Sequence, residues 1–212
     1  DQAYDFGGAG NGRTITADAG AVLIDGTDGL VSTGAFNTGA VAPSGTGVRM
    51  VWNPRKAAFR AGNVTNTNWD DANIGTSSVA LGNNPLATGL ASVAIGNVVT
   101  ASGLGSSAFG TSSLAIGRAS TVFGRQNIAN TNESTAFGYN NVAFSYGETV
   151  LGLGATFYTP STNGATQFGI ANATDRLFVI GNAIDSNNNS FIDATERSNA
   201  MVVLKNGNTG IG

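Results

Sequence analysis

Residues 78–82 read SVALG and residues 92–96 read SVAIG, and the pattern returns as SAFG, TVFG, TAFG and TVLG up to Gly152. A glycine that follows a large apolar residue therefore recurs every 14 residues without insertion or deletion. The pairs are Leu81-Gly82, Ile95-Gly96, Phe109-Gly110, Phe123-Gly124, Phe137-Gly138 and Leu151-Gly152. Such a regular period indicates a repeat architecture.

The period predicts the geometry of one repeat unit. Fourteen residues are too few for a helical repeat, and the alternation of polar and apolar residues within 78–81 is typical of a β-strand. Two short strands and two tight turns account for one repeat, so the sequence predicts an all-β parallel solenoid with one coil per repeat. A second glycine series lies half a period away, and we expect the glycines to supply the positive φ of the corners. This second series is Gly75, Gly89, Gly103 and Gly117.

The two faces of each strand are predicted to differ in role. We expect the large residues before the glycines to stack inside the coil as an apolar ladder, with alanines on the opposite face. Those alanines are Ala80, Ala94, Ala108 and Ala136. Burial in so thin a core contributes little free energy. It offsets only a small part of the cost of ordering the backbone, which is ~1–2 kcal/mol per residue. Small alanines let a second chain approach closely, so we predict a homo-oligomer; a monomer with solvent-facing alanines is the alternative.

Composition excludes several classes of function. The net charge of -3 gives no case for nucleic-acid binding, and no apolar run of 18 residues predicts a membrane span. With no cysteine and no histidine, the chain has no disulfide, no Ser-His-Asp triad and no imidazole-bound metal. A start at Asp1 without methionine and an end at Gly-Ile-Gly lead us to expect a segment of a longer protein.

Carboxylate chemistry is the remaining route to catalysis. A solenoid enzyme that cleaves polysaccharide needs two acidic side chains facing each other across a sugar. Glu133 and Glu148 are the acidic residues inside the repeats, and they occupy different positions within the 14-residue unit. We therefore predict a non-enzymatic protein, with a polysaccharide-acting enzyme as an alternative.

The flanking sequences divide the chain into four parts: 1–47, 48–73, the repeats at 74–157, and 158–212. The first part is expected to form irregular β structure, because 13–17, 21–25 and 29–33 alternate like short strands between turn residues; a flexible arm is the alternative. The last part holds two hydrophobic runs, 177–180 and 201–204. These predict strands that pair with each other or across chains.

Basic and aromatic residues gather ahead of the repeats, and two interpretations apply. The residues are Arg49, Trp52, Arg55, Lys56 and Arg60. One interpretation is a cap over the end of the solenoid, built by Trp52, Phe59 and Trp69, with arginines pairing across subunits to Asp70 or Asp71. The other is a ligand patch, in which Trp52 stacks on a sugar and the basic groups hold an anionic glycan.

An Asn-rich stretch between the two hydrophobic runs has the spacing of a calcium loop. From Asp185 it reads DSNNNSFIDATE. Side-chain oxygens fall at EF-hand ligand positions, with a backbone carbonyl at position 7. The predicted ligands are Asp185, Asn187, Asn189, the carbonyl of Phe191, Asp193 and Glu196. Ser190 stands where an EF-hand has glycine, and a metal-free Asn-rich turn is the alternative.

The motifs at 78–82 and 92–96, with their 14-residue spacing, resemble the head repeats of YadA-type trimeric autotransporter adhesins. The resemblance is strong over 74–152, and similar modules occur in phage-like tail fibres. It implies a left-handed parallel β-roll, a homotrimer, and an extracellular position on a bacterial cell surface. Residues 50–62 and 197–212 resemble segments that flank such repeats.

The resemblance and the residues together predict a non-enzymatic head or shaft segment of a trimeric surface fibre. Its partner would be a protein or glycan of a cell or matrix. The alternative from another class is a structural spacer of a tail fibre or injection-system appendage. Binding arrays separate these two, and turnover of an acidic polysaccharide would reveal the enzyme.

Overall fold

The computed structural model describes residues 20–212, which fall into two units divided after Thr33. In the first unit the described residues are exposed and form neither strand nor helix. The strands expected at 21–25 and 29–33 are therefore wrong: an alternating segment becomes a strand only where another strand pairs with it. The strand expected at 13–17 lies outside the described residues.

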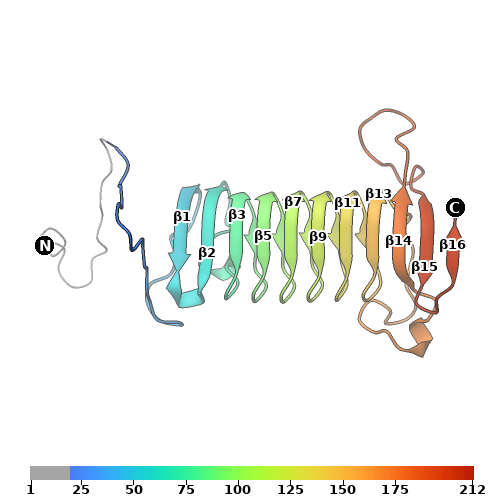
Figure 1. Ribbon diagram of the computed structural model, residues 1–212, viewed down its shortest axis with the longest axis horizontal. Coiled ribbons are helices and arrows are strands. Elements are labelled where there is room, and N and C mark those ends of the chain that lie inside the picture. Colours follow the sequence, from blue (N-terminus) through green and yellow to red (C-terminus); the bar gives the residue numbers. More distant parts are fainter. Residues whose placement is uncertain (1–19) are drawn as a thin grey trace, which may run out of the picture. The chain divides into compact units, whose positions relative to one another are not determined.

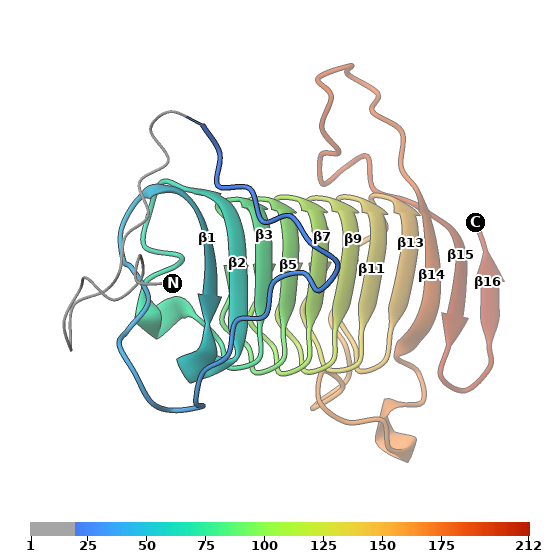
Figure 2. The same ribbon diagram turned by 60° about the vertical axis from the view of Figure 1, so that its left-hand side comes forward.

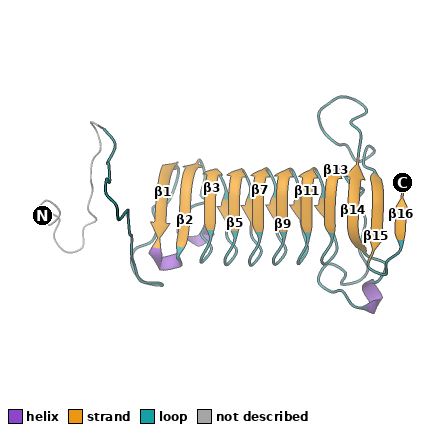
Figure 3. Cartoon of the chain, in the orientation of Figure 1, coloured by secondary structure: helices purple, strands orange, loops and turns teal. Residues whose placement is uncertain are grey.

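The second unit consists of two sheets, and Figures 1 and 3 show the larger one as a row of side-by-side strands. The larger sheet contains β1 (Gly47–Asn53), β2 (Ala58–Val64), β3 (Val79–Asn83), β5 (Val93–Asn97), β7 (Ser107–Thr111), β9 (Thr121–Arg125), β11 (Thr135–Tyr139), β13 (Thr149–Leu153), β14 (Arg176–Asn182), β15 (Asn199–Leu204) and β16 (Thr209–Ile211). The smaller sheet contains β4 (Leu86–Ala87), β6 (Thr100–Ala101), β8 (Leu114–Ala115), β10 (Ile128–Ala129) and β12 (Val142–Ala143).

Three short 3₁₀ helices, Pro54–Lys56, Asp71–Asn73 and Ile170–Asn172, lie in connections of the second unit. Within residues 20–212, no helix is both long and apolar enough to cross a membrane.

Each repeat forms one coil, which confirms the β-solenoid with 14-residue coils. A coil contributes one five-residue strand to the larger sheet and one two-residue strand to the smaller, so the second strand is shorter than expected. Successive long strands are parallel and bring equivalent residues opposite each other, as in Leu81 with Ile95 and Gly82 with Gly96. Figure 2 shows the corner turns stacked in the same way.

The predicted inside and outside of the coil are reversed. The interior is built from fully buried small residues. They are Ala80, Ala94, Ala108, Val122 and Ala136 from the long strands and Ala87, Ala101, Ala115, Ala129 and Ala143 from the short ones. The large residues before the glycines point outward, and Phe123 is 51% exposed. Between the long and short strands of the repeat coils, the buried side chains are alanine or valine.

The expectation that the glycines supply positive φ holds for the first series and is wrong for the second. Gly82, Gly96 and Gly110 have φ of 121°, 140° and 113°, whereas the glycines of the second series do not have positive φ. The tight corners also carry positive φ at residues other than glycine, for example Ala91 at 55° and Val98 at 54°. Both series lie where the backbone of the next coil leaves no room for a side chain. A Cβ on Gly103 would lie 2.0 Å from the carbonyl oxygen of Gly117.

In the smaller sheet, the residues that flank each short strand donate backbone N–H groups to carbonyls of the next coil. The N–H of Ser102, for example, bonds the carbonyl of Ala115 at 2.9 Å. The last coil has no following coil, so the N–H groups after its short strand lack the carbonyls that accept them in earlier coils. Buried polar backbone groups need other partners at this end.

Side chains add donors at the first coil, where the carbonyls of Ser78 and Ala87 also accept the backbone N–H groups of Phe59 and Gly75. Trp69 is buried, and its Nε1–H donates to the carbonyl of Pro85 at 3.1 Å. Arg60 lies inside the coil, where its guanidinium donates to the carbonyls of Ser78 and Ala87, each at 3.0 Å. Burial lowers the pKa of Arg60 to about 10, so it stays charged at neutral pH. The expected cap exists, but Trp52 and Phe59 are not part of the buried plug, because they point outward with the ladder.

Both flanking parts extend the larger sheet. The hairpin of β1 and β2 stacks with β2 parallel to β3, and at the other end β14 lies parallel to β13. The hydrophobic runs at 177–180 and 201–204 are strands that pair with each other within the chain, in antiparallel β14 and β15. Two long loops leave this end, one before β14 and one before β15 (Figure 1).

Candidate interaction surface

An apolar ladder runs along the outer face of the larger sheet. Strand register places its members opposite one another from β1 to β16. They are Met50, Ala61, Leu81, Ile95, Phe109, Phe123, Phe137, Leu151, Ile180, Met201 and Ile211. The sequence predicted the six members within the repeats and missed the others. The sequence pattern that would identify the other members is weak, because the flanking strands lie outside the 14-residue period.

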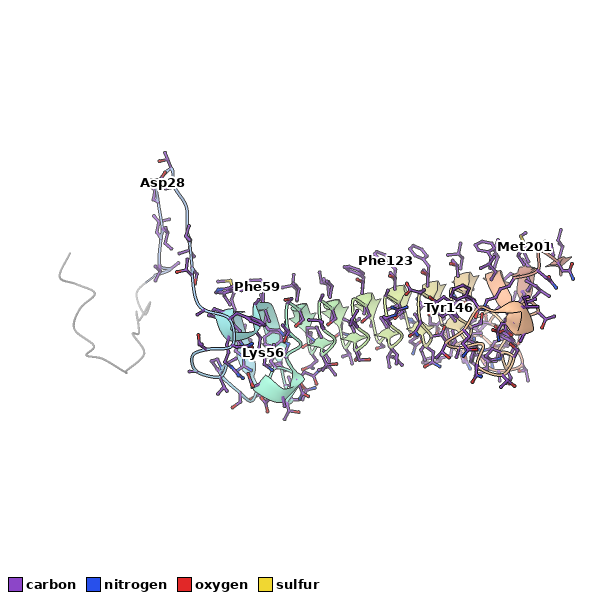
Figure 4. The ribbon with its side chains drawn as sticks, turned by 90° about the horizontal axis from the view of Figure 1, so that it is seen from below. Asp28, Lys56, Phe59, Phe123, Tyr146 and Met201 are labelled. Carbon is purple, nitrogen blue, oxygen red and sulfur yellow. The ribbon has the colours of Figure 1, made fainter. Side chains whose placement is uncertain are left out.

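The apolar ladder is uncovered in the single chain. Phe123 and Phe137 are 51% and 48% exposed, and Met50 is 72% exposed. The rings of Phe123 and Phe137 are stacked with centroids 5.2 Å apart and an interplanar angle of 9°. Figure 4 shows Phe59, Phe123 and Met201 on the same side of the molecule. An exposed apolar strip of this length is typical of an interface.

Polar side chains border the apolar ladder along one edge. Asn63, Asn83 and Asn97 form a chain of amide hydrogen bonds of 3.0 and 2.7 Å. Further along the same row, the guanidinium of Arg125 lies 4.2 Å from the ring centroid of Tyr139. Both residues also bond the carbonyl of Ser190 in the loop before β15. The face thus combines an apolar centre with a polar border.

The five residues of the predicted ligand patch do not share a surface. Arg60 is buried inside the coil, where no ligand reaches it. Trp52 lies on the outer face of β1, whereas the neighbouring Arg49 alternates to the inner face. This arrangement contradicts the patch, because alternate residues of a strand point to opposite sides.

The remaining basic groups of that set have partners within the chain. Arg55 forms an ion pair with Asp71, and its hydrogen bond is the main cause of the lowered pKa of Asp71. Lys56 donates to the carbonyl of Ile74 at 2.9 Å. Arg49 lies over the ring of Trp69 at 5.7 Å. The pairing expected between subunits at Asp71 therefore occurs within one chain.

The predicted calcium ligands do lie together in one exposed loop, but their oxygens accept hydrogen bonds from the loop itself. Asp185 accepts the backbone N–H of Ser190 at 2.8 Å, and Asp193 accepts the amide of Asn187 at 2.9 Å. Glu196 accepts from the hydroxyl of Ser186, which is the main cause of its lowered pKa.

Two further features bear on the calcium prediction. Ser190 adopts a φ of 67°, so the chain does turn at the position where an EF-hand has glycine. Within residues 20–212, no three acidic side chains form a cluster suited to a metal ion. Calcium binding would therefore depend on asparagine and backbone oxygens as well, and it stays a prediction.

We expect millimolar calcium to raise the thermal midpoint of the protein relative to EDTA, because an ion that binds the folded state stabilises it by mass action. The measurement is a pair of melting curves, with magnesium as the control ion. Asp193→Asn should remove the calcium effect, since it deletes a ligand charge. Superimposed wild-type curves, with no heat of calcium binding in calorimetry, would contradict the prediction.

A family model for the YadA head domain repeat matches residues 74–98, 100–120 and 115–141. These segments coincide with the stacked coils from β3 to β11. Residues 74–141 are therefore similar to YadA head domain repeats, and this match confirms the resemblance seen in the sequence. The YadA head family is an adhesin family without enzymatic activity. No curated protein matches the chain significantly.

Proposed function

We propose that this chain is a non-catalytic segment of a bacterial surface fibre, in which three copies associate through the apolar ladder and present an adhesive outer surface. The observation that carries the proposal is the exposed ladder along the outer face of the larger sheet. We propose three associating copies because YadA heads are trimeric.

The thin interior supports association. The coil buries mainly alanine and serine, which remove little apolar surface from water, whereas burial of one phenylalanine contributes about 1.5–3 kcal/mol. The largest apolar side chains of the long strands, Phe109, Phe123 and Phe137, lie on the ladder instead. Covering the ladder with two other copies would bury the surface that the single coil leaves in water.

The outer flank of the coil stays open when ladders face one another. A groove of about 720 Å³ lies there against the smaller sheet. Its lining includes Ile116, Ile128, Phe144 and Tyr158. Three copies of such a flank on one axis would bind a repetitive partner with avidity, because later contacts become intramolecular.

The positions of the acidic residues in the repeats argue against a solenoid enzyme that cleaves polysaccharide. Glu133 is exposed and pairs with Arg118 at 3.0 Å, whereas Glu148 is fully buried inside the coil. Two acids in such different environments cannot face a sugar together. A structural spacer remains the alternative function, since no feature of the groove identifies a ligand.

Two measurements test the proposal. Light scattering should give a mass near three times the chain mass of 21.3 kDa; a clean mass near 21.3 kDa would rule out the trimer. Arrays of matrix proteins and glycans should then show binding that weakens when Phe144 and Tyr158 are replaced by alanine. A trimer that binds no array member would favour the spacer.

A further inference from the structure

The smaller sheet ends at β12, and one side chain completes its hydrogen bonding. In the preceding coils, two successive N–H groups donate to an alanine carbonyl of the next coil, as Ile116 and Gly117 do to Ala129 at 2.9 and 3.3 Å. In the last coil no such carbonyl exists. The N–H groups of Phe144 and Ser145 instead donate to Oε2 of Glu148, at 2.6 and 2.9 Å.

Glu148 occupies a position that is serine in every earlier coil. The column is Ser78, Ser92, Ser106, Ser120, Ser134 and Glu148, and each member is fully buried. Its backbone keeps the register of the repeat, since the N–H of Thr135 donates to its carbonyl at 2.8 Å. Only the side chain changes, in the coil where the smaller sheet ends. Glu148 therefore replaces the missing alanine carbonyl.

The second oxygen of the carboxyl group has no partner. Oε1 of Glu148 is buried and makes no hydrogen bond. A buried, unpartnered charge is far more costly than a neutral hydroxyl in the same place. The other oxygen accepts its two N–H groups whether the carboxyl group is ionised or protonated. The buried, unpartnered oxygen thus disfavours the ionised carboxylate.

Charged and titratable groups around Glu148 come from β14 and from the segments that flank β14 and β15. Arg176 of β14 and Lys205 after β15 favour its ionised form, and Tyr158 and Asp175 lie in the same cluster. Among the residues that the structure describes, neither Arg176 nor Lys205 is close enough to Glu148 to form an ion pair with it. Burial raises the pKa of Glu148 to about 7, because its cost for the charged form outweighs the two backbone N–H hydrogen bonds and these attractions, which all favour ionisation.

We propose that Glu148 is a proton-dependent cap of the solenoid: the carboxyl group holds the last coil closed while it is protonated, and loss of the proton favours opening of this end. The end that opens comprises the turn at Phe144 and Ser145 and the connection packed on it. Tyr158 and Arg176 belong to that packing, since the N–H of Arg176 donates to the hydroxyl of Tyr158 at 3.3 Å.

The sign of the pH effect follows from the two states. The pKa is about 7 in the closed end and near its ordinary 4.5 in an opened, solvated one. Closing therefore takes up a proton, and the closed end is most stable at low pH and weakens as pH rises towards 7. Between about pH 5 and about pH 8, linkage predicts a roughly 70-fold increase in the opening constant.

Native-state hydrogen exchange tests this inference. After correction for the intrinsic pH dependence, the amides of Phe144 and Ser145 should lose protection between mildly acidic and mildly basic pH. Glu148→Gln keeps the acceptor without the charge and should remove this loss. Glu133→Gln, at an exposed position, should retain it. The same pH response in Glu148→Gln and wild type would overturn the proposal.

A second measurement does not depend on a variant. The side-chain carboxyl ¹³C signal of Glu148 in the wild-type protein should titrate with a midpoint near 7. A midpoint at or below the ordinary value of 4.5 would overturn the proposal, because the folded end would then hold an ionised carboxylate. Neither experiment depends on the trimer or on an adhesive partner.

Discussion

Replacing Gly103 by alanine is expected to prevent the solenoid from folding. The added Cβ would lie 2.0 Å from the carbonyl oxygen of Gly117 and 2.5 Å from its carbonyl carbon. Both atoms belong to the backbone of the next coil, which is held by the ladder of hydrogen bonds and cannot move aside alone. We expect a loss of more than ~4 kcal/mol, a large share of the ~5–15 kcal/mol that stabilises a typical protein.

Gly105 provides a matched control two residues away. It has a φ of 65°, and a Cβ there would meet no atom within 4 Å. The equivalent corner residues in neighbouring coils are Ala91 and Ala119, which already adopt this conformation. Gly105→Ala should therefore cost only about 1 kcal/mol. Circular dichroism melts and soluble yield measure both variants, and similar melts would contradict the steric explanation.

Phe123→Asp is expected to convert the proposed trimer into a monomer that keeps its fold. In the single chain the side chain of Phe123 is half exposed, so aspartate there is hydrated and leaves the coil intact. In the assembled ladder it would place an unpaired charge among apolar rings, which costs several kcal/mol in each of three subunits. The solution mass should fall to near 21.3 kDa, with the β signal in circular dichroism unchanged.

The control for this variant is Phe123→Leu. Leucine stands at equivalent ladder positions in other coils, at Leu81 and Leu151. It keeps the apolar contact, so the mass should stay that of the assembly. A wild-type trimer that survives Phe123→Asp would show that the apolar ladder is not the interface.

The sequence predicted the coil, its length and the parallel stacking, because a 14-residue period with strand-like alternation allows few other folds. It also predicted the strands at 177–180 and 201–204 from their hydrophobicity. The ligand patch was wrong, since closeness in sequence did not place Arg49, Trp52 and Arg60 on one surface. In a strand, neighbours point to opposite faces, and Arg60 was needed inside the coil.

Sequence alone therefore determined the repeat and the two faces of each strand, but not which face is buried. Alternation with a period of 2 is the same for either choice. The tertiary structure decides it through the thickness of the coil, which admits Ala80 and excludes Phe123. The role of Glu148 was decided in the same way. Glu148 acts as a cap only because no short strand follows β12. Where the last short strand lies is a property of the assembled sheet, and the residues around Glu148 do not reveal it.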